Sequence, residues 1–232
     1  MTLDLRNAEL PEIANHYQSP NSSWVRANMV VSKDGQFVGP NNTSRDLTSA
    51  QDLSLLLLLR ALSDVLLVGA NTARQENYRA PKKRAEFAFL NRPTTTLAIV
   101  SSSLDFDLAS PLFHGGEQQT LILNAGGNEP SNELLKVAKV VQVLSDSNFG
   151  IRLIETLSDL GFPKVTCEGG PGLLSQLLAA EVVDEYDLTI SPIVSGIRSP
   201  LPNVLPNDLN WHLAASASAG DFKFQRYLRN RA

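Results

Sequence analysis

The chain has one cysteine, three histidines and no long apolar run among its 232 residues. A single cysteine excludes a disulfide within the chain and any multi-cysteine zinc site. His16, His114 and His212 are scattered and lack the spacing of metal ligands, so we expect no metal site. The longest apolar run, 53–59, is interrupted by Ser54 and is far too short to span a bilayer.

An excess of positive charge is also missing. The formal net charge of −4 argues against a protein that binds nucleic acid or an anionic membrane surface. The first residues carry no basic stretch followed by an apolar one, so no secretory signal is expected. With 43% hydrophobic and 19% charged residues, the composition is typical of a globular protein, and we expect a cytoplasmic enzyme.

Short apolar segments alternate with helical ones along most of the chain. The predicted strands are 24–31, 64–68, 96–100, 120–123, 140–144, 164–168, 186–191 and two more near the C-terminus. The predicted helices are 49–62, 171–180 and one that ends at Leu160 and is capped by Ser147 or Asn148. This alternation predicts a mostly parallel sheet with helices on both faces, and the late strands predict an antiparallel edge.

Local signals refine this picture. Thr48 is expected to cap the helix that follows it. Phe37 and Val38 are expected to begin a return strand after the turn at 32–35. The polar residues 1–22 are interpreted as a leader segment, and 23–232 as one domain.

The segment 165–174 is the most informative in the chain. It reads as an apolar strand that ends in Glu168, a glycine turn, and a helix that begins near Pro171. Glycine backbone allows a ligand to approach closely, and the amides of a helix N-terminus favour an anion. The segment therefore predicts a phosphate cradle and an acid in one place. The dinucleotide fingerprint Gly-x-Gly-x-x-Gly is absent.

Two other strand ends carry similar residues, at 32–35 and at 69–72. Ligands of open α/β sheets bind beyond the carboxyl ends of the strands, so the three ends are candidates for one pocket. Taken alone, each is an ordinary turn; Glu168 is more specific because a carboxylate at a buried strand end is costly without a purpose. We interpret 82–84 as a solvated basic loop and Cys167 as a buried strand residue.

These motifs occur in an order that resembles one family. The set is Ser32-x-Asp34-Gly35, Leu59-Arg60-Ala61, Leu67-Val68-Gly69-Ala70-x-Thr72, Glu168-Gly169-Gly170-Pro171, Val183-Asp184-Glu185 and Pro192-x-x-x-Gly196. It is similar to the reductase domain of bacterial riboflavin-biosynthesis deaminase/reductase proteins. The resemblance implies a dihydrofolate-reductase-like three-layer α/β fold, with a mostly parallel sheet and antiparallel C-terminal strands, and a homodimer. The deaminase half is absent, since its zinc signature cannot be built from one cysteine.

The resemblance also implies an activity. Members reduce the ribosyl group of 5-amino-6-(5-phosphoribosylamino)uracil with hydride from NADPH, delivered to C1′ of the opened sugar. Glu168 falls where the family has a catalytic acid beside substrate and nicotinamide. The positions on the substrate side are Asn28, Ser44, Thr48, Arg60, Glu76 and Arg79. The positions on the cofactor side are Gly69, Ala70, Thr72, Arg74, Ser101, Ser102, Gly169, Gly170, Gly172 and Leu173, with the two serines at the adenosine 2′-phosphate.

The chain departs from the family pattern on the substrate side. Asn28 stands where the family usually has a lysine, Glu76 where it has aspartate, and Arg79 only roughly matches a family arginine. Loss of a cation beside the substrate would remove a charge-assisted hydrogen bond. Two alternatives therefore stay open: a reductase of another heterocycle, such as a dihydropterin or dihydrofolate, and a non-catalytic nucleotide-binding relative.

Overall fold

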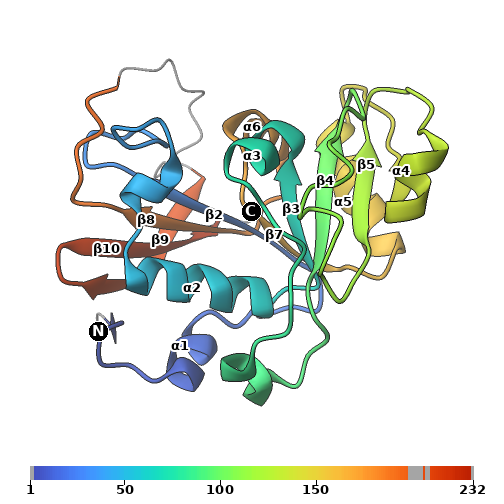
Figure 1. Cartoon of the computed structure of the whole chain (residues 1–232). Coiled ribbons are helices and arrows are strands. Elements are labelled where there is room, and N and C mark those ends of the chain that lie inside the picture. The colour runs from blue at the N-terminus through green and yellow to red at the C-terminus, as the bar shows by residue number, and fades with distance from the viewer. Residues whose placement is uncertain (1–2, 198–205, 207–209, 231–232) are drawn as a thin grey trace.

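The computed structural model describes residues 3–197, 206 and 210–230 (Figure 1). The strands are β1 (Leu3–Asp4), β2 (Trp24–Val31), β3 (Val65–Gly69), β4 (Thr96–Ser101), β5 (Thr120–Asn124), β6 (Ala138–Gln142), β7 (Lys164–Cys167), β8 (Glu185–Ile190), β9 (Trp211–Ala219) and β10 (Phe222–Arg229). The α-helices are α1 (Leu10–His16), α2 (Ala50–Ala61), α3 (Ala70–Gln75), α4 (Asn132–Val137), α5 (Phe149–Asp159) and α6 (Pro171–Ala179). Two 3-10 helices, η1 (Ser44–Leu47) and η2 (Ala85–Leu90), lie in the connections.

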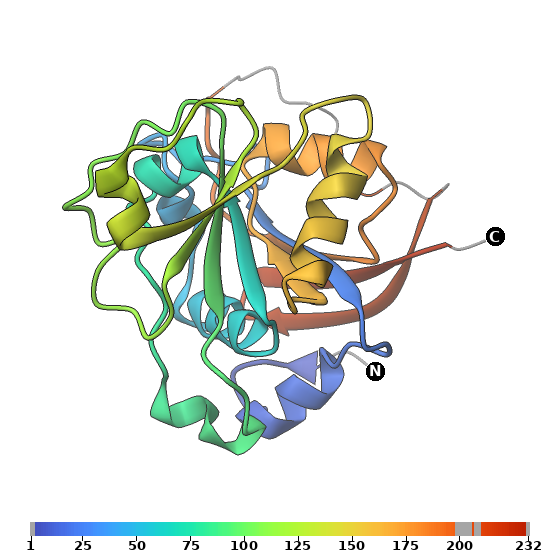
Figure 2. The ribbon, with the colours of Figure 1, turned by 90° about the vertical axis from the view of Figure 1, so that its right-hand side faces the viewer.

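In the described part of the chain, the strands form one ten-stranded sheet in the order β1-β9-β10-β8-β2-β7-β3-β4-β5-β6. All neighbours from β8 to β6 run parallel, whereas β10 is antiparallel to both β8 and β9. The hairpin of β9 and β10 extends from one side of the sheet (Figure 2). The predicted parallel sheet with antiparallel C-terminal strands is confirmed.

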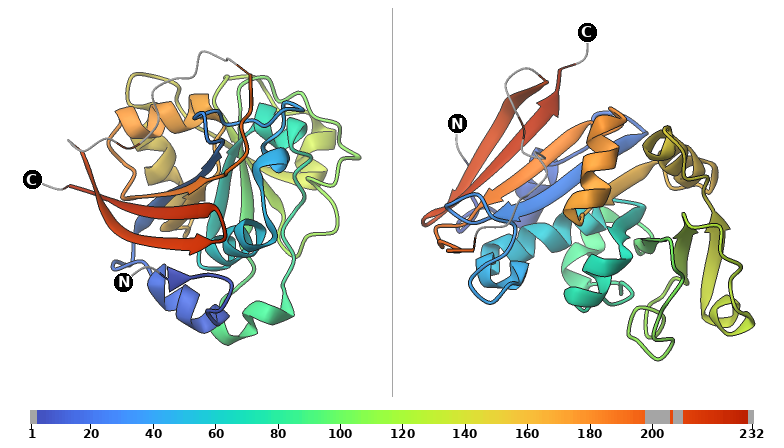
Figure 3. Two further views of the ribbon diagram at one scale, coloured as in Figure 1. Left: turned by 90° about the vertical axis from the view of Figure 1, so that its left-hand side faces the viewer. Right: turned by 90° about the horizontal axis from the view of Figure 1, so that it is seen from above.

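Helices cover both faces of this sheet (Figure 3). The buried leucines of α2 pack with α1 and Phe224 on one face. On the other face, α5 buries Phe149, Leu153 and Leu157, which recur at every fourth position and so share one side of the helix. The structure therefore has the three layers that the sequence predicts.

Parallel strands leave their carboxyl ends along one edge of the sheet. There β3 ends at Gly69, which pairs with Val100 of β4, and β4 ends one residue later at Ser101. On the other side of β3, β7 ends at Cys167, paired with Leu67. The loops that carry the predicted site residues thus emerge next to one another.

Two local predictions near the first turn were wrong. Phe37 and Val38 form no strand, because Phe37 leaves the loop to pack in the core, where it is buried. Thr48 does not cap the helix; the hydroxyl of Ser49, one residue later, accepts from the amide of Asp52 at 3.1 Å. Both residue types are good caps, so the sequence pattern could not separate them.

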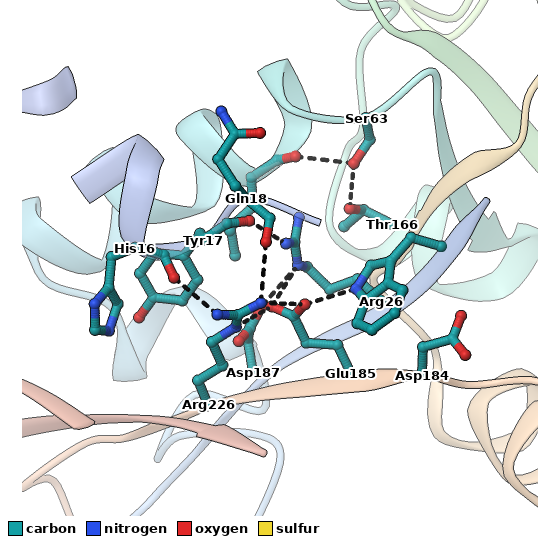
Figure 4. A network of polar contacts seen from close by, with 12 residues as sticks. His16, Tyr17, Gln18, Arg26, Ser63, Thr166, Asp184, Glu185, Asp187 and Arg226 are labelled. Atoms are coloured by element: carbon teal, nitrogen blue, oxygen red, sulfur yellow. Dashed lines mark hydrogen bonds and ion pairs between the residues drawn. The ribbon is translucent and has the colours of Figure 1, made fainter. Parts of the chain in front are cut away.

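The segment before residue 23 contributes to the sheet and the core. β1 pairs with β9, and α1 packs on α2. The guanidinium of Arg26 donates to the carbonyl of Tyr17 at 2.6 Å, and that of Arg226 donates to the carbonyl of His16 at 2.9 Å (Figure 4). Glu185 holds both arginines at 3.0 and 2.8 Å, so a buried ionic network fastens α1 to the sheet. No helix among the described residues is long and apolar enough to cross a bilayer.

Candidate active site

A buried carboxylate lies at the end of β7 and is held by two side chains. The Nε and Nη2 of Arg60 each donate to one oxygen of Glu168 at 2.7 Å, which is a two-point contact between the planar groups. The hydroxyl of Tyr78 donates to Oε2 of Glu168 at 2.6 Å, and the Arg60 guanidinium lies 5.3 Å from the centre of the Tyr78 ring. Residues from α2, from the end of β7 and from the loop after α3 thus converge.

The charges of this triad stabilise one another. Burial would lower the pKa of Arg60, but the negative charge and hydrogen bonds of Glu168 raise it above its usual value, so the guanidinium stays protonated. Burial, followed by the charge of Glu168, raises the pKa of the Tyr78 hydroxyl well above its usual value. Tyr78 therefore keeps its proton at neutral pH and remains a hydrogen-bond donor.

The glycine turn after Glu168 packs against the end of β3. The amide of Gly69 donates to the carbonyl of Gly169 at 2.8 Å. Gly169 has a φ of +83°, in the region that favours glycine. A Cβ on Gly170 would lie 2.4 Å from the Thr72 hydroxyl, so only glycine fits without a shift. The predicted cofactor-side residues of the two loops are therefore brought together.

Helix α6 begins directly at this turn. Gly170 is its N-cap, Pro171 stands in its first turn, and Leu173 is buried and anchors the helix to the core. A Cβ on Gly172 would meet no atom within 4 Å, so this end of the helix is open. The first amides of a helix have no partner within the helix and carry partial positive charge. This arrangement of amides and glycines fits a diphosphate.

The loop before α2 is tied to the loop after α3. Glu76 accepts from the Ser44 amide at 3.0 Å and from the Thr43 hydroxyl at 3.1 Å, and its carbonyl accepts from the side chain of Arg45. The Thr48 hydroxyl donates to the carbonyl of Ser44 at 3.5 Å. Three predicted substrate residues, Ser44, Thr48 and Glu76, are thus adjacent. The carboxylate of Glu76 holds the loop in place.

The remaining cofactor-side residues lie along the edge at β3 and β4. Ala70 is buried at the start of α3. Arg74 donates to the carbonyl of Asp105 at 2.9 Å and to the side chain of Asn71, which directs it toward the loop after β4. The Ser101 hydroxyl is buried and accepts from a backbone amide of that loop, whereas Ser102 is exposed. A cofactor role for these residues stays a prediction.

A cavity of about 730 Å³ lies between the C-terminal end of α2 and the loop around η2. Arg60 and Arg79 line it, and so does the basic run 82–84, whose side chains are exposed. The run was interpreted as a solvated loop; its place in the cavity wall depends on the fold of residues far apart in sequence. Arg60 therefore links this basic cavity to Glu168.

Sequence reasoning missed Asp52 and gave Tyr78 no role. Asp52 is buried in the first turn of α2, and burial raises the pKa of its carboxyl. The only available signal was an acid within a leucine-rich helix.

Asn28, on β2, lies between β7 and β8 on the sheet face that α2 covers, as shown by its spacing from Arg26. Among the described residues, no group of three or more His, Cys, Asp or Glu is arranged to hold a metal ion.

Comparisons with known proteins point to one family. The family model described as the RibD C-terminal domain matches residues 23–221. The 2,5-diamino-6-ribosylamino-4(3H)-pyrimidinone 5′-phosphate reductase of Archaeoglobus fulgidus is 27% identical over 182 residues, covering 75% of this chain and 83% of that protein. A pyrimidine reductase-like protein of Corynebacterium diphtheriae matches with a TM-score of 0.82 at 25% identity, over 97% of this chain and all of the other.

A likeness in fold alone extends further. Dihydrofolate reductase from Enterococcus faecalis, solved with NADP(H), matches with a TM-score of 0.50 and 12% identity, over 90% of this chain and 97% of that one. The dihydrofolate-reductase-like fold that the sequence implies is confirmed.

Proposed function

The chain belongs to the RibD C-terminal domain family, and we propose that it is an NADPH-dependent reductase of riboflavin biosynthesis. The reaction is hydride transfer to C1′ of the opened ribosyl group of a phosphoribosylaminopyrimidine, which becomes a ribityl chain. Two substrates fit this description: 5-amino-6-(5-phosphoribosylamino)uracil, implied by the sequence motifs, and the 2,5-diamino-pyrimidinone in the name of the Archaeoglobus enzyme. The two differ at C2 of the pyrimidine, which does not react.

One observation carries the proposal: the acid and the glycine turn are consecutive in the chain. Glu168 faces Arg60 and Tyr78, whereas the next two residues, Gly169 and Gly170, pack against the end of β3. A carboxylate pressed against a phosphate would repel it, so the two features serve different ligands. Two ligands bound on either side of residue 168 would meet at this point, as hydride transfer requires.

The cofactor side suits a dinucleotide. We assign its diphosphate to the first amides of α6 and the glycines of the turn, where a side chain would intrude. Arg74 of α3 and Ser102, in the loop after β4, are assigned to the adenosine phosphate, which would favour NADPH over NADH. The bound cofactor supplies the hydride.

The substrate side offers positive charge and a proton donor. Arg60 and Arg79 line the basic cavity and are assigned to the substrate phosphate, because guanidinium groups match phosphate oxygens. Tyr78 keeps its proton and donates to Glu168, so we assign to these two residues the proton that reduction at C1′ requires. We further propose, from the sequence resemblance, that the enzyme is a cytoplasmic homodimer.

The test is NADPH oxidation by the purified protein with each of the two ribosylaminopyrimidine phosphates, and with dihydrofolate and a dihydropterin as alternatives. We expect turnover of a ribosylaminopyrimidine only, and a slower rate with NADH. Folded protein that binds NADPH but reduces only dihydrofolate or a dihydropterin would overturn the substrate assignment. Folded protein that reduces none of the four would support the non-catalytic alternative.

A further inference from the structure

The cavity beside the C-terminal end of α2 gathers charge of one sign. Its lining contains six cations and one acid, namely Arg60, Arg79, Lys82, Lys83, Arg84, Arg92 and Glu86. The whole chain has a formal net charge of −4, so this excess of positive charge is a local feature. A concave wall that carries one sign of charge attracts ligands of the opposite sign. The cavity therefore favours an anion.

Half of these cations have no acid beside them. Three are held in the ion pairs Arg60–Glu168, Arg84–Glu86 and Arg92–Asp64. The other three, Arg79, Lys82 and Lys83, make no ion pair within the described part of the chain. The substrate phosphate, assigned to Arg60 and Arg79, carries about two negative charges. It leaves the two lysines without a partner, so the cavity has the charge to bind a second anion.

The loop that carries the lysines, 82–84, is fixed at its backbone. The amide of Glu117 donates to the carbonyl of Pro81 at 3.3 Å. The side chain of Glu117 accepts from the amide of Lys83 at 3.0 Å and from the hydroxyl of Thr94 at 2.6 Å. A wall that is already ordered loses less conformational freedom when a ligand binds. The basic run is thus a built part of the cavity.

Much of the cavity lining is apolar. The apolar residues include Leu57, Ala61, Pro81, Phe87, Leu90 and Pro93. Phe87 is buried and packs with the leucines of α2, so this part of the wall is anchored in the core. The volume of about 730 Å³ lies within the range of roughly 300–1,000 Å³ that is usual for small-molecule pockets. The cavity therefore suits a ring system that carries an anionic group.

We propose that the cavity is a second ligand site, which binds a phosphorylated aromatic ring compound with its ring on the apolar residues and its phosphate at Lys82 and Lys83. Two anions in one cavity repel each other, so this ligand and the substrate exclude each other. The exclusion rests on the proposed function, whereas the binding does not. Neither the glycine turn at 169–170 nor Gly172 lines the cavity, so the ligand leaves the NADPH site free.

The experiment uses flavin mononucleotide (FMN), which joins a tricyclic aromatic ring to one phosphate, and riboflavin, which has the same ring without the phosphate. Quenching of their fluorescence measures binding to the full chain, to Lys82→Gln/Lys83→Gln and to a control, Lys136→Gln/Lys139→Gln. Lys136 and Lys139 are exposed residues of α4 and β6 that do not line the cavity, and the control removes the same charge.

We expect the unmodified protein and the control to bind FMN at least about tenfold more tightly than riboflavin, because only FMN reaches the lysines with a charge. In Lys82→Gln/Lys83→Gln this ratio should fall to within about threefold. FMN should also raise KM for the ribosylaminopyrimidine phosphate without changing kcat, and leave the Kd of NADPH unchanged.

The outcomes separate this inference from the proposed function. Equal binding of FMN and riboflavin, or no binding of FMN, to the folded protein overturns the second site, and this comparison decides the point even if the lysine variant does not fold. A ratio that persists in the folded lysine variant, or displacement of NADPH by FMN, overturns it as well. Loss of FMN binding in the lysine variant alone supports the site even if no ribosylaminopyrimidine is reduced, in which case the proposed function fails by itself.

Discussion

The contact between Arg60 and Glu168 is the strongest polar interaction of the candidate site, and Glu168→Gln tests it. The substitution keeps the shape of the side chain but replaces one acceptor oxygen by an NH2 donor. At the Oε1 position that donor faces Nε of Arg60, and at the Oε2 position it faces both Nη2 of Arg60 and the Tyr78 hydroxyl, all of which already donate at 2.6 to 2.7 Å. At least one donor therefore loses its acceptor, and the positive charge of Arg60 loses its partner.

The size of the effect follows from burial. Breaking a fully buried ion pair costs about 3–5 kcal/mol. The Glu168 side chain is 4% exposed but that of Arg60 is 25% exposed, so water screens part of the loss. We expect the free energy of unfolding to fall by about 2–3 kcal/mol, which for a chain of this size lowers Tm by roughly 4–12 °C. We expect kcat/KM for the ribosylaminopyrimidine to fall at least about 100-fold.

Urea unfolding and NADPH oxidation measure the two effects. The matched control is Glu181→Gln, because Glu181 also pairs with an arginine, Arg229, at 2.8 Å, but its side chain is 73% exposed. That control should change stability by less than about 1 kcal/mol and leave turnover unchanged. If Glu168→Gln is as stable and as active as the control, Glu168 neither holds Arg60 nor takes part in the reaction.

Three further predictions concern the glycine turn, acid stability and the cysteine. Gly170→Ala should weaken NADPH binding in a titration because its Cβ meets the Thr72 hydroxyl at 2.4 Å, and Thr72→Ala should relieve the effect in the double variant. Gly172→Ala, which meets no protein atom within 4 Å, should leave the Tm unchanged or higher but also weaken NADPH binding. The Ser32 hydroxyl and loop amides lower the pKa of Asp34 from 3.8 to about 2. The ionised carboxylate therefore contributes to stability above pH 3.8, and this contribution is lost as the pH falls toward 2. In urea unfolding, Asp34→Asn should flatten this part of the pH–stability curve. Burial raises the pKa of Cys167 to about 12, so a thiol reagent at pH 8 should react with it only after unfolding.

The parts of the fold that were predicted are those with a local signal. Strands such as 96–100 were found because apolar runs alternate with helical segments, and this pattern also gave the parallel sheet. β1 was missed because two residues show no periodicity, and its pairing with β9 depends on residues more than 200 positions away. α3 and α4, with six residues each, were missed for a similar reason.

The residues of the candidate site also fall into those with a local sequence signal and those brought together only by the fold. Glu168 and the glycines after it were found because an acid and a turn at a buried strand end are unusual in themselves. The contact of Arg60 with Glu168 joins residues 108 positions apart, and only the packing of α2 on the sheet brings them together. Asp52 was overlooked because an acid in the first turn of a helix is common, and its burial depends on how α2 packs in the fold. Contacts of this kind depend on tertiary structure and carry no signal in the spacing of residues.

The central claim is that substrate and cofactor meet at Glu168, where hydride passes from NADPH to C1′ of the ribosyl group. The most direct measurement uses NADPH with deuterium at both C4 positions of the nicotinamide, with mass and NMR analysis of the product. The account predicts one deuterium at C1′ of a ribityl chain, and a rate of transfer that falls at least about 100-fold in Glu168→Gln. A folded enzyme that binds NADPH and the ribosylaminopyrimidine together but transfers no deuterium to C1′ would contradict it.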